Sequence, residues 1–418
     1  MKWVKKDNTM KLPVKSWCIN VEPGALDQAV DLSNHPAVIN HVALMPDCHQ
    51  GYGMPIGGVI ICKNAVIPNA VGVDIGCGMG AIETDFISDN IKDMRQIRGL
   101  MDYLKNRIPV GEGNSHKFAK EWNGFNQYLQ SLGLDHPLMD FSQKKLPGWL
   151  DSRAWELAQY NLGTLGGGNH FIELQKSDAG YVWLMLHSGS RNLGHRIATF
   201  YNKLALDLNE KWKTPLPNKN LAFLPADSRE GKEYLRDMNF ALSYARENRR
   251  RMMEIFKEAV QMTFSHVSFR QEINIHHNYA AIENHFRQNV WIHRKGATSA
   301  KKDEMGIIPG SMGTASYIVR GKGNPESFMS CSHGAGRKMS RTAACENLSV
   351  KDCNDAMQGI VFDRWHTVKS RYGRKKKKGQ MDLSEAPPAY KSIDAVIESE
   401  LDLIDPVVKL IPLGVVKG

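Results

Sequence analysis

The sequence contains no uninterrupted apolar run long enough to span a bilayer, which argues against a protein held in a membrane by hydrophobic helices. Its first residues, MKWVKKDNTMKLPVKSW, also lack the apolar segment of a secretory signal peptide. We therefore expect a cytoplasmic protein with no membrane partner.

Cysteine is scarce. The chain has seven cysteines among 418 residues, and no two of them form a CxxC pair. An odd number of scattered cysteines, in a long chain without an export signal, does not suggest a disulfide framework. We expect at most one or two of them to take part in chemistry. The seven are Cys18, Cys48, Cys62, Cys77, Cys331, Cys345 and Cys353.

The common phosphate-binding loops are absent as well. The glycine-rich stretch LGTLGGGNH, residues 162–170, is followed by no Gly-Lys-Ser/Thr and lacks the GxGxxG spacing. As a phosphate-binding motif it is weak.

The composition is that of a globular protein with a sizeable core, with 42% hydrophobic and 23% charged residues. Lys and Arg number 54 against 44 Asp and Glu, which gives a formal net charge of +10. This excess favours a polyanionic partner without identifying it, and it is also common in plain soluble enzymes.

Helical and strand-like segments are mixed along the chain rather than strictly alternating, which predicts an α+β fold instead of a doubly wound sheet. Apolar residues spaced three and four apart predict one or two amphipathic helices over residues 229–264. The basic patch RENRRRM within that segment is interpreted as a solvated face. Further helices are predicted at 94–106 and 150–161, and strands within 37–85 (VINHVALMP, PIGGVIICK, NAVIPNAVGVDI) and in HFIEL, YVWLML, INIHHNY, NVWIHRKGA, MGIIPG and TASYIVRG.

Two segments are interpreted more simply. Residues 1–35 are uninformative about function. The run RKKKK at 374–378, inside a polar segment at 370–382, is interpreted as a basic loop.

The stretch SCSHGAGRKMSR, residues 330–341, surrounds His333 with small residues and continues to Arg337 and Arg341. Small neighbours let a large substrate group approach the backbone, and the two arginines would share a face if the segment were helical. Such an arrangement can hold a phosphate against the histidine. A glycine-bearing turn followed by a basic surface helix explains the same residues equally well.

Asp74 and Cys77 lie three residues apart in the glycine-rich VGVDIGCGMG. A carboxylate and a thiolate from one turn can ligate manganese, iron, cobalt or zinc, although a structural cysteine beside a turn aspartate is the simpler reading of this pair. Three strand-like runs add imidazoles that would be buried and need partners, which together favour a metal centre with Cys77 bridging two ions. These runs carry His170 with Asn169 and Glu173, then His187, and then the adjacent His276 and His277.

Several other polar residues stand near these motifs, and each alone is better explained as a cap, turn or surface residue. They are Asp47, His49, Lys295, Ser311, Ser316 and Lys417.

Ten motifs, taken together and in this order, resemble the RtcB-type RNA ligases, which are GTP-dependent enzymes that join a 3′-phosphate to a 5′-hydroxyl. The resemblance runs from about Asp47 to Gly418. The motifs are MPDCHQGYGMPIGG, VGVDIGCGMG, LGTLGGGNHFIE, LHSGSR, HHNY, RKGA, IIPGSMG, SHGAGR with its following MSR, AYKSIDAV and VKG.

The resemblance implies roles for individual residues. His333 would be the nucleophile that takes GMP from GTP, with Asp47 helping to activate it and Arg337 beside it. His277, directly before Asn278, fits the family pattern better than His276. Two manganese ions would be held by Asp74, Cys77, His170, His187 and His277, with the cysteine shared. Contacts to GTP are implied for Asn169, Glu173, Ser311, Ser316, His333, Gly334, Arg337, Tyr390 and Lys417, and contacts to phosphate or RNA for Arg191, Lys295 and Arg341.

The resemblance also implies the substrate and the architecture. RNA ends bearing a 3′-phosphate or 2′,3′-cyclic phosphate would be joined to 5′-hydroxyl ends in tRNA splicing or RNA repair. One α+β catalytic domain over residues 1–418 would have sheets lining a central pocket for two metal ions, with flanking helices. We expect a monomer, and the need for an activating protein stays open. Two alternatives remain: an enzyme that caps 3′-phosphate ends with GMP without efficient sealing, and a noncatalytic RNA-binding relative.

Overall fold

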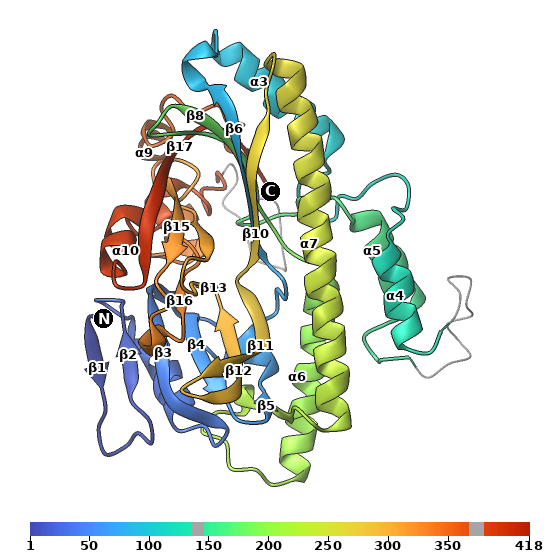
Figure 1. Ribbon diagram of the computed structural model, residues 1–418, viewed down its shortest axis with the longest axis vertical. Helices are drawn as coiled ribbons and strands as arrows, with labels where there is room; N and C mark the ends of the chain where they lie inside the picture. The colour runs from blue at the N-terminus through green and yellow to red at the C-terminus, as the bar shows by residue number, and fades with distance from the viewer. Residues whose placement is uncertain (135–145, 368–379) are drawn as a thin grey trace.

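A computed structural model describes residues 1–134, 146–367 and 380–418 and shows two large β-sheets, with the long helix α7 (Arg229–Thr263) packed along them (Figure 1). The mixture of sheets and helices confirms the predicted α+β class. Among the described helices, none combines the length and apolar character needed to cross a membrane.

The larger sheet has seven strands, and every neighbouring pair in it is antiparallel. Because antiparallel pairing needs no crossover helix, helices can lie outside this sheet without alternating with its strands. The strands in spatial order are β10 (Phe269–His276), β6 (Gly78–Ile87), β8 (Tyr181–Ser188), β7 (Phe171–Ser177), β17 (Ile404–Lys417), β15 (Ser316–Gly321) and β14 (Met305–Ile308).

The second sheet has six strands, and only β2 and β3 pair in parallel. Its order is β1 (Trp3–Lys5), β2 (Val14–Ser16), β3 (Val38–His49), β4 (Ile56–Cys62), β12 (Gln288–Lys295) and β11 (Asn278–His285). Two short ribbons pair β13 (Ala297–Ser299) with β16 (Ser330–Ser332) and β5 (Ala65–Val66) with β9 (Leu224–Pro225).

The chain passes directly from one sheet to the other at His277, the single residue between β10 and β11. Figure 1 shows this passage beside α7. A residue at such a junction can reach side chains carried by both sheets.

Helix α7 forms because its apolar residues recur at three and four spacing and because Ser228 caps its start by accepting from the Gly231 amide. Its buried face packs against β6, β8 and β10. The other helices are α1 (Pro23–Ser33), α2 (Pro68–Val71), α3 (Met94–Arg107), α4 (Asn123–Ser131), α5 (Ser152–Asn161), α6 (Leu193–Lys211), α8 (Arg341–Asn347), α9 (Val350–Asp355) and α10 (Ile393–Ser399). Short 3-10 turns occupy Ser88–Asn90, Lys219–Leu221, Pro325–Ser327 and Pro387–Ala389.

The structure confirms the helices predicted near 94–106, 150–161 and 229–264, the last as one helix. The strand prediction for NAVIPNAVGVDI is wrong beyond Val66, because Pro68 begins the short helix α2. The solvated-face interpretation of RENRRRM is wrong for Arg249, which is buried. The run RKKKK lies outside the described residues.

Candidate active site

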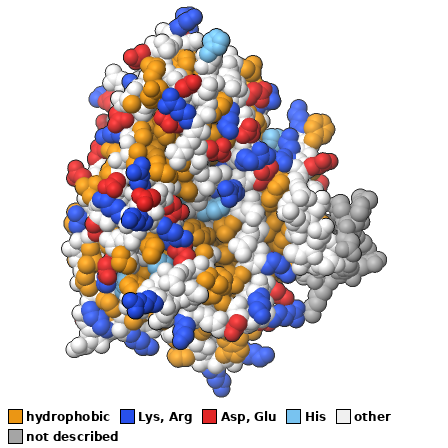
Figure 2. Space-filling model, viewed as in Figure 1, with side chains coloured by type: hydrophobic (Ala, Val, Ile, Leu, Met, Phe, Trp, Pro, Cys, Tyr) orange, Lys and Arg blue, Asp and Glu red, His pale blue; other side chains and the backbone are white. Residues whose placement is uncertain are grey.

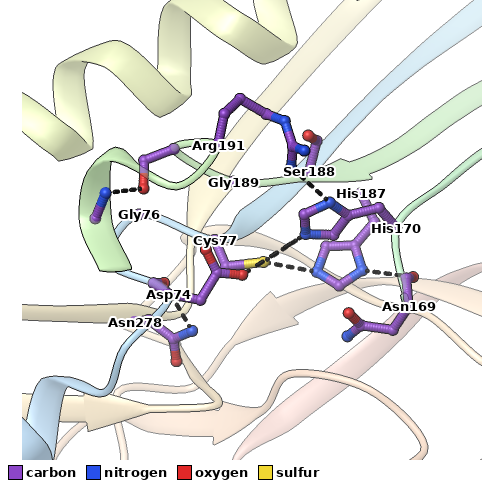
Figure 3. A network of polar contacts seen from close by, with 12 residues as sticks. Asp74, Gly76, Cys77, Asn169, His170, His187, Ser188, Gly189, Arg191 and Asn278 are labelled. Atoms are coloured by element: carbon purple, nitrogen blue, oxygen red, sulfur yellow. Dashed lines mark hydrogen bonds and ion pairs between the residues drawn. The ribbon is translucent and has the colours of Figure 1, made fainter. Parts of the chain in front are cut away.

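A thiol and two imidazoles converge on a buried point where β6 and β7 begin and β8 ends (Figure 3). The Cys77 Sγ atom lies 3.1 Å from His187 Nε2 and 3.5 Å from His170 Nε2. The Nε2 atoms of His187 and His277 are 3.3 Å apart, and Asp74 Oδ2 lies 3.6 Å from His170 Nε2. The donor set that sequence reasoning assembled from four separate segments therefore meets in one place.

Hydrogen bonds fix which ring nitrogens face the thiol. His170 Nδ1 lies 2.9 Å from the Leu165 carbonyl, and His187 Nδ1 lies 3.2 Å from the Asn169 carbonyl. Because a carbonyl can only accept, each Nδ1 carries the proton and each Nε2 turns a lone pair toward Cys77. Neutral imidazoles with one nitrogen held by a carbonyl are the usual form of histidine metal ligands.

The chemistry of this donor set fits a transition metal. Burial holds the pKa of His187 and His277 well below the usual range, so both rings stay neutral and able to coordinate. Burial also raises the pKa of the Cys77 thiol, so a thiolate there needs a cation as partner. The Nδ1 atom of His277 is buried without a hydrogen-bond partner among the described residues.

Arg249 of α7 holds the segments that carry these donors. Its Nη1 donates to the carbonyls of Gly76 and Ser188, each at 2.9 Å, and its Nε donates to Asn274 Oδ1 at 2.8 Å. Gly76 and Ser188 directly adjoin Cys77 and His187. A buried guanidinium that satisfies carbonyls in the turn before β6 and at the end of β8 fixes their spacing, so Arg249 positions the donors without being one.

The side chains of the adjacent residues His276 and His277 point in different directions. His277 turns into the donor cluster, whereas His276 Nδ1 lies 3.1 Å from both the Gly76 carbonyl and Arg249 Nη2. The two side chains point apart because successive residues of an extended chain face opposite sides. The geometry therefore brings His277, and not His276, to the cluster.

His333 forms a dyad with Asp47 next to the cluster. Its Nδ1 lies 2.5 Å from Asp47 Oδ2, and its backbone amide donates to the same oxygen at 3.1 Å. Burial alone would raise the pKa of Asp47, but electrostatic attraction to the His333 ring and the hydrogen bond from it outweigh burial and leave that pKa lowered. The rings of His333 and His277 meet edge to face with centroids 4.9 Å apart.

A glycine from another segment, Gly296, packs against this ring. Gly296 has a φ of +58°, and a Cβ added there would lie 3.1 Å from His333 Cε1. The preceding amide, of Ser332, donates to buried Glu400 Oε2 at 2.9 Å. Two carboxyl groups thus hold consecutive amides at His333, and burial raises the pKa of Glu400 well above its ordinary value.

A second group of charges surrounds Glu385. Arg341 Nε donates to Glu385 Oε1 at 2.7 Å, Arg337 Nη1 lies 3.3 Å from that oxygen, and Lys417 Nζ lies 3.8 Å from Oε2. Tyr390 donates to Oε2, and Arg337 also lies over its ring. Burial alone would raise the pKa of Glu385, but Lys417 and Arg341 lower it to about 2.

The condition under which Arg337 and Arg341 would share a helical face is not met, because α8 begins only at Arg341 with Ser340 as its cap. The two guanidiniums converge instead through Glu385, which the sequence analysis missed. Three cations around one carboxylate leave a net positive charge that suits an anionic ligand.

Other predicted residues fall into smaller groups. Gln175 Nε2 donates to Glu173 Oε2 at 2.6 Å and to Ser316 Oγ at 3.2 Å, which links those two predicted residues. Burial raises the pKa of Glu173 to about 8, although Lys417 opposes the shift. Ser311 bonds to Thr314 within its own turn.

Three further predicted residues make separate contacts: Arg191, Gly334 and Lys295. The Arg191 Nη1 atom lies 3.3 Å from His170 Nδ1, so Arg191 adjoins the cluster. Gly334 follows the nucleophile candidate and faces Pro309. Lys295 Nζ donates to the Tyr52 and Asn69 carbonyls, and burial lowers the pKa of Lys295 to about 7. Those contacts turn its amine toward backbone rather than toward His333.

Two residues that organise the site were missed in the sequence analysis, and only one of them, Arg249, has a signal in the sequence. Glu385 stands in SEAPPAY, a turn-like stretch without a recognisable motif. Arg249 was hidden in a basic run, although its spacing from the buried Ala245, Met252 and Phe256 placed it on the apolar face of α7.

Comparison with known proteins identifies one family. The family model described as "tRNA-splicing ligase RtcB" matches residues 28–418. The chain is 37% identical to the "RNA-splicing ligase RtcB" of Escherichia coli K12, over 98% of each chain. It is 32% identical to the "tRNA-splicing ligase RtcB" of Thermococcus kodakarensis, over 94% of this chain and 91% of that protein. The protein of the same name in Nanoarchaeum equitans is 31% identical, over 99% and 97% of the respective chains.

Proposed function

Because the chain belongs to the family of the tRNA-splicing ligase RtcB, we propose that it is an RNA ligase of tRNA splicing or RNA repair, working through guanylylation of His333. The observation that carries the proposal is the Asp47–His333 dyad lying against the cluster of Cys77 and its histidines. The substrates would be an RNA end with a 3′-phosphate or 2′,3′-cyclic phosphate, an RNA 5′-hydroxyl end, and GTP.

The dyad supports a nucleophilic role for one particular nitrogen. Since Nδ1 of His333 donates to Asp47, its Nε2 keeps a lone pair for attack on the α-phosphorus of GTP. The new N–P bond replaces the bond to the β-phosphate oxygen, and pyrophosphate leaves. The ring becomes cationic in this step, and the Asp47 carboxylate neutralises that charge.

Two transfers complete the proposed cycle. An oxygen of the RNA 3′-phosphate attacks the guanylyl phosphorus, the N–P bond breaks, and His333 regains its lone pair. The 5′-hydroxyl oxygen then attacks the phosphorus of the RNA 3′-phosphate, loses its proton, and expels GMP. A cyclic phosphate would first be opened by water.

Two manganese ions would be held by Asp74, Cys77, His170, His187 and His277. When bound, they would neutralise phosphate charge and make phosphorus a better electrophile. Arg191 adjoins this cluster and can contact a phosphate. The cations Arg337, Arg341 and Lys417 would take phosphates or the RNA end, with Glu385 holding them in place.

The guanine nucleotide would lie against the residues that the family resemblance implies. Glu173, raised in pKa and linked through Gln175 to Ser316, can hold a polar edge of the base. The proposed set is completed by Asn169, Ser311, Gly334 and Tyr390, and Lys295 would act through the backbone that it holds. Because the dyad and the cluster draw on both sheets, we propose one catalytic unit.

The test uses GTP labelled on its α-phosphate, with manganese, on the parent, His333→Ala and His195→Ala. His195 is an exposed histidine of α6 and serves as the matched control. Covalent label on the parent and His195→Ala, but not on His333→Ala, is expected. Label on His333→Ala would refute the assignment of the nucleophile.

A second assay separates sealing from capping. The parent is given a 3′-phosphate strand and a 5′-hydroxyl strand with GTP and manganese. A joined product is expected. Accumulation of a GMP-capped strand without joining would instead establish the capping alternative.

A further inference from the structure

A surface between α7 and the segment before α4 combines exposed cations with an exposed aromatic ring. Phe118 is 78% exposed, the highest value among the large hydrophobic side chains of the described residues. Lys117 stands beside it in the chain, and Arg246 and Arg250 are exposed on the neighbouring face of α7. Figure 2 shows Lys and Arg side chains gathering beside the middle of α7.

The backbone around Phe118 is held on both sides. The His116 amide donates to the Tyr160 carbonyl, and the Lys120 amide donates to the Gln159 carbonyl, each at 3.0 Å. His116 Nε2 also lies 3.1 Å from the Gly163 carbonyl. The ring is therefore presented to solvent from a fixed loop, which is a preorganised stacking surface.

A hollow of about 440 Å³ adjoins this loop on the face of α7. Arg251 joins the two by donating to the Glu121 carbonyl, while its Nε pairs with Glu247. Arg250 also pairs with Glu247, through Nε at 2.7 Å and Nη2 at 2.9 Å. Arg246, in contrast, makes no ion pair with any described residue, so its charge is available to a ligand and Arg250 would exchange Glu247 for a phosphate. The hollow is lined by Trp122, Ser243, Arg246, Glu247, Arg250, Glu272 and Asn274.

This surface adjoins the candidate active site through shared residues. Asn274, in the wall of the hollow, accepts from Arg249, the residue that holds the carbonyls beside Cys77 and His187. On the other side, His116 contacts Gly163 in the loop that leads to His170. The surface and the candidate active site are therefore linked by packed residues of α7, β10 and the loop before His170.

We propose that Lys117, Phe118, Trp122, Arg246 and Arg250, here called the α7 platform, bind single-stranded RNA flanking the ends to be joined. A base would stack on Phe118, and phosphates would contact Lys117, Arg246 and Arg250. Aromatic rings interleaved with cations bind single strands with little sequence preference, as required for a ligase that reads ends. This inference rests on the proposed RNA-ligase function.

The test measures binding of a fluorescent single-stranded RNA of about twenty nucleotides, and of one of about four, by anisotropy. The variants are Phe118→Ala, Phe118→Trp and Arg246→Ala. The matched control is Met262→Ala, since Met262 is a 68% exposed apolar residue of the same helix away from the platform. Labelling by GTP on the same preparations verifies an intact nucleotide site.

Phe118→Ala is expected to weaken binding of the long RNA roughly tenfold, the size of one lost base stack, with Phe118→Trp restoring it. Arg246→Ala is expected to lower the slope of log affinity against log salt by about 0.7, as for one single-strand phosphate contact. The short RNA should respond less to both.

The inference would be overturned if the long RNA bound the parent, Phe118→Ala and Arg246→Ala with equal affinity, even if the parent seals ends normally. The exposed surface would then be better explained as a site for a protein partner. A parent that binds RNA through the α7 platform but neither seals nor caps would refute the proposed function and leave this inference standing.

Discussion

Replacing Asp47 with Asn tests the dyad most directly, because the side chain keeps its shape and loses its charge. In the structure one oxygen of Asp47 accepts both the backbone amide and the ring Nδ1 of His333. An asparagine oxygen can keep both hydrogen bonds. What disappears is the negative charge opposite a ring that would turn cationic in the proposed guanylylation.

The size of the effect follows from the geometry. Unit charges separated by the 2.5 Å between Nδ1 and Oδ2 interact by about 7 kcal/mol at an effective dielectric constant of about 20. Only part of the positive charge has developed at the transition state. We therefore expect guanylylation to slow by about 10² to 10⁴-fold, or about 3 to 5 kcal/mol.

The assay is single-turnover labelling with α-labelled GTP, corrected for the folded fraction. Asp237→Asn provides the control, since Asp237 is an equally buried aspartate that accepts from Tyr128 and Trp149 away from the site. Labelling of Asp47→Asn within a factor of about two of the parent would refute the reasoning, because the charge would then have no role in the step.

Three further predictions concern other carboxyls and the thiol. Glu400→Gln should change the free energy of unfolding little, because a neutral amide oxygen can still accept the hydrogen bond from the Ser332 amide. Glu400→Ala should lower the free energy of unfolding by about 2 to 4 kcal/mol in denaturant titrations. An equal decrease for both variants would contradict a neutral Glu400 side chain in the folded protein. The folded-state pKa of Glu385 is about 2 against an ordinary 4.5, so its carboxylate stabilises the fold above about pH 4.5 and this stabilisation is lost as pH falls toward 2. Glu385→Gln should therefore reduce the loss of unfolding free energy between pH 4.5 and 2 by on the order of 3 kcal/mol. An unchanged pH dependence of the unfolding free energy in this range would contradict the prediction. Cys77→Ser should lower the amount of manganese bound per protein, measured by elemental analysis after dialysis. Cys62→Ser, at a cysteine that is also buried, should leave that amount unchanged. Equal manganese content in the two variants would argue against Cys77 as a ligand.

The sequence predicted the fold class and most of the long elements because their information is local. The apolar spacing of α7 and the short apolar runs of β7 and β8 are visible without any knowledge of neighbours. Pro68 shows the limit: a strand-like composition surrounded a residue that favours the first turn of a helix.

The donor residues of the site were visible because glycine-framed polar residues inside apolar runs are conspicuous. The residues that hold these donors in place could not be recognised from the sequence, because their role depends on which segments meet in the fold. Arg249 looked like part of a solvated basic run until β6, β8 and β10 packed against it, and Glu385 has meaning only beside Arg341 and Lys417. Such long-range pairings have no local sequence signature.

The passage of the chain between the two sheets at His277 has a consequence for folding. Asp47 and His333, which are 286 residues apart, meet only after the strands that carry them are in place, and His277 is set only when β10 and β11 have joined different sheets. Closing loops of this length is slow, and partial structures gain nothing from it. Tight binding at the proposed manganese site should therefore arise late in refolding, and the metal would then report on completion of the fold rather than guide its early collapse.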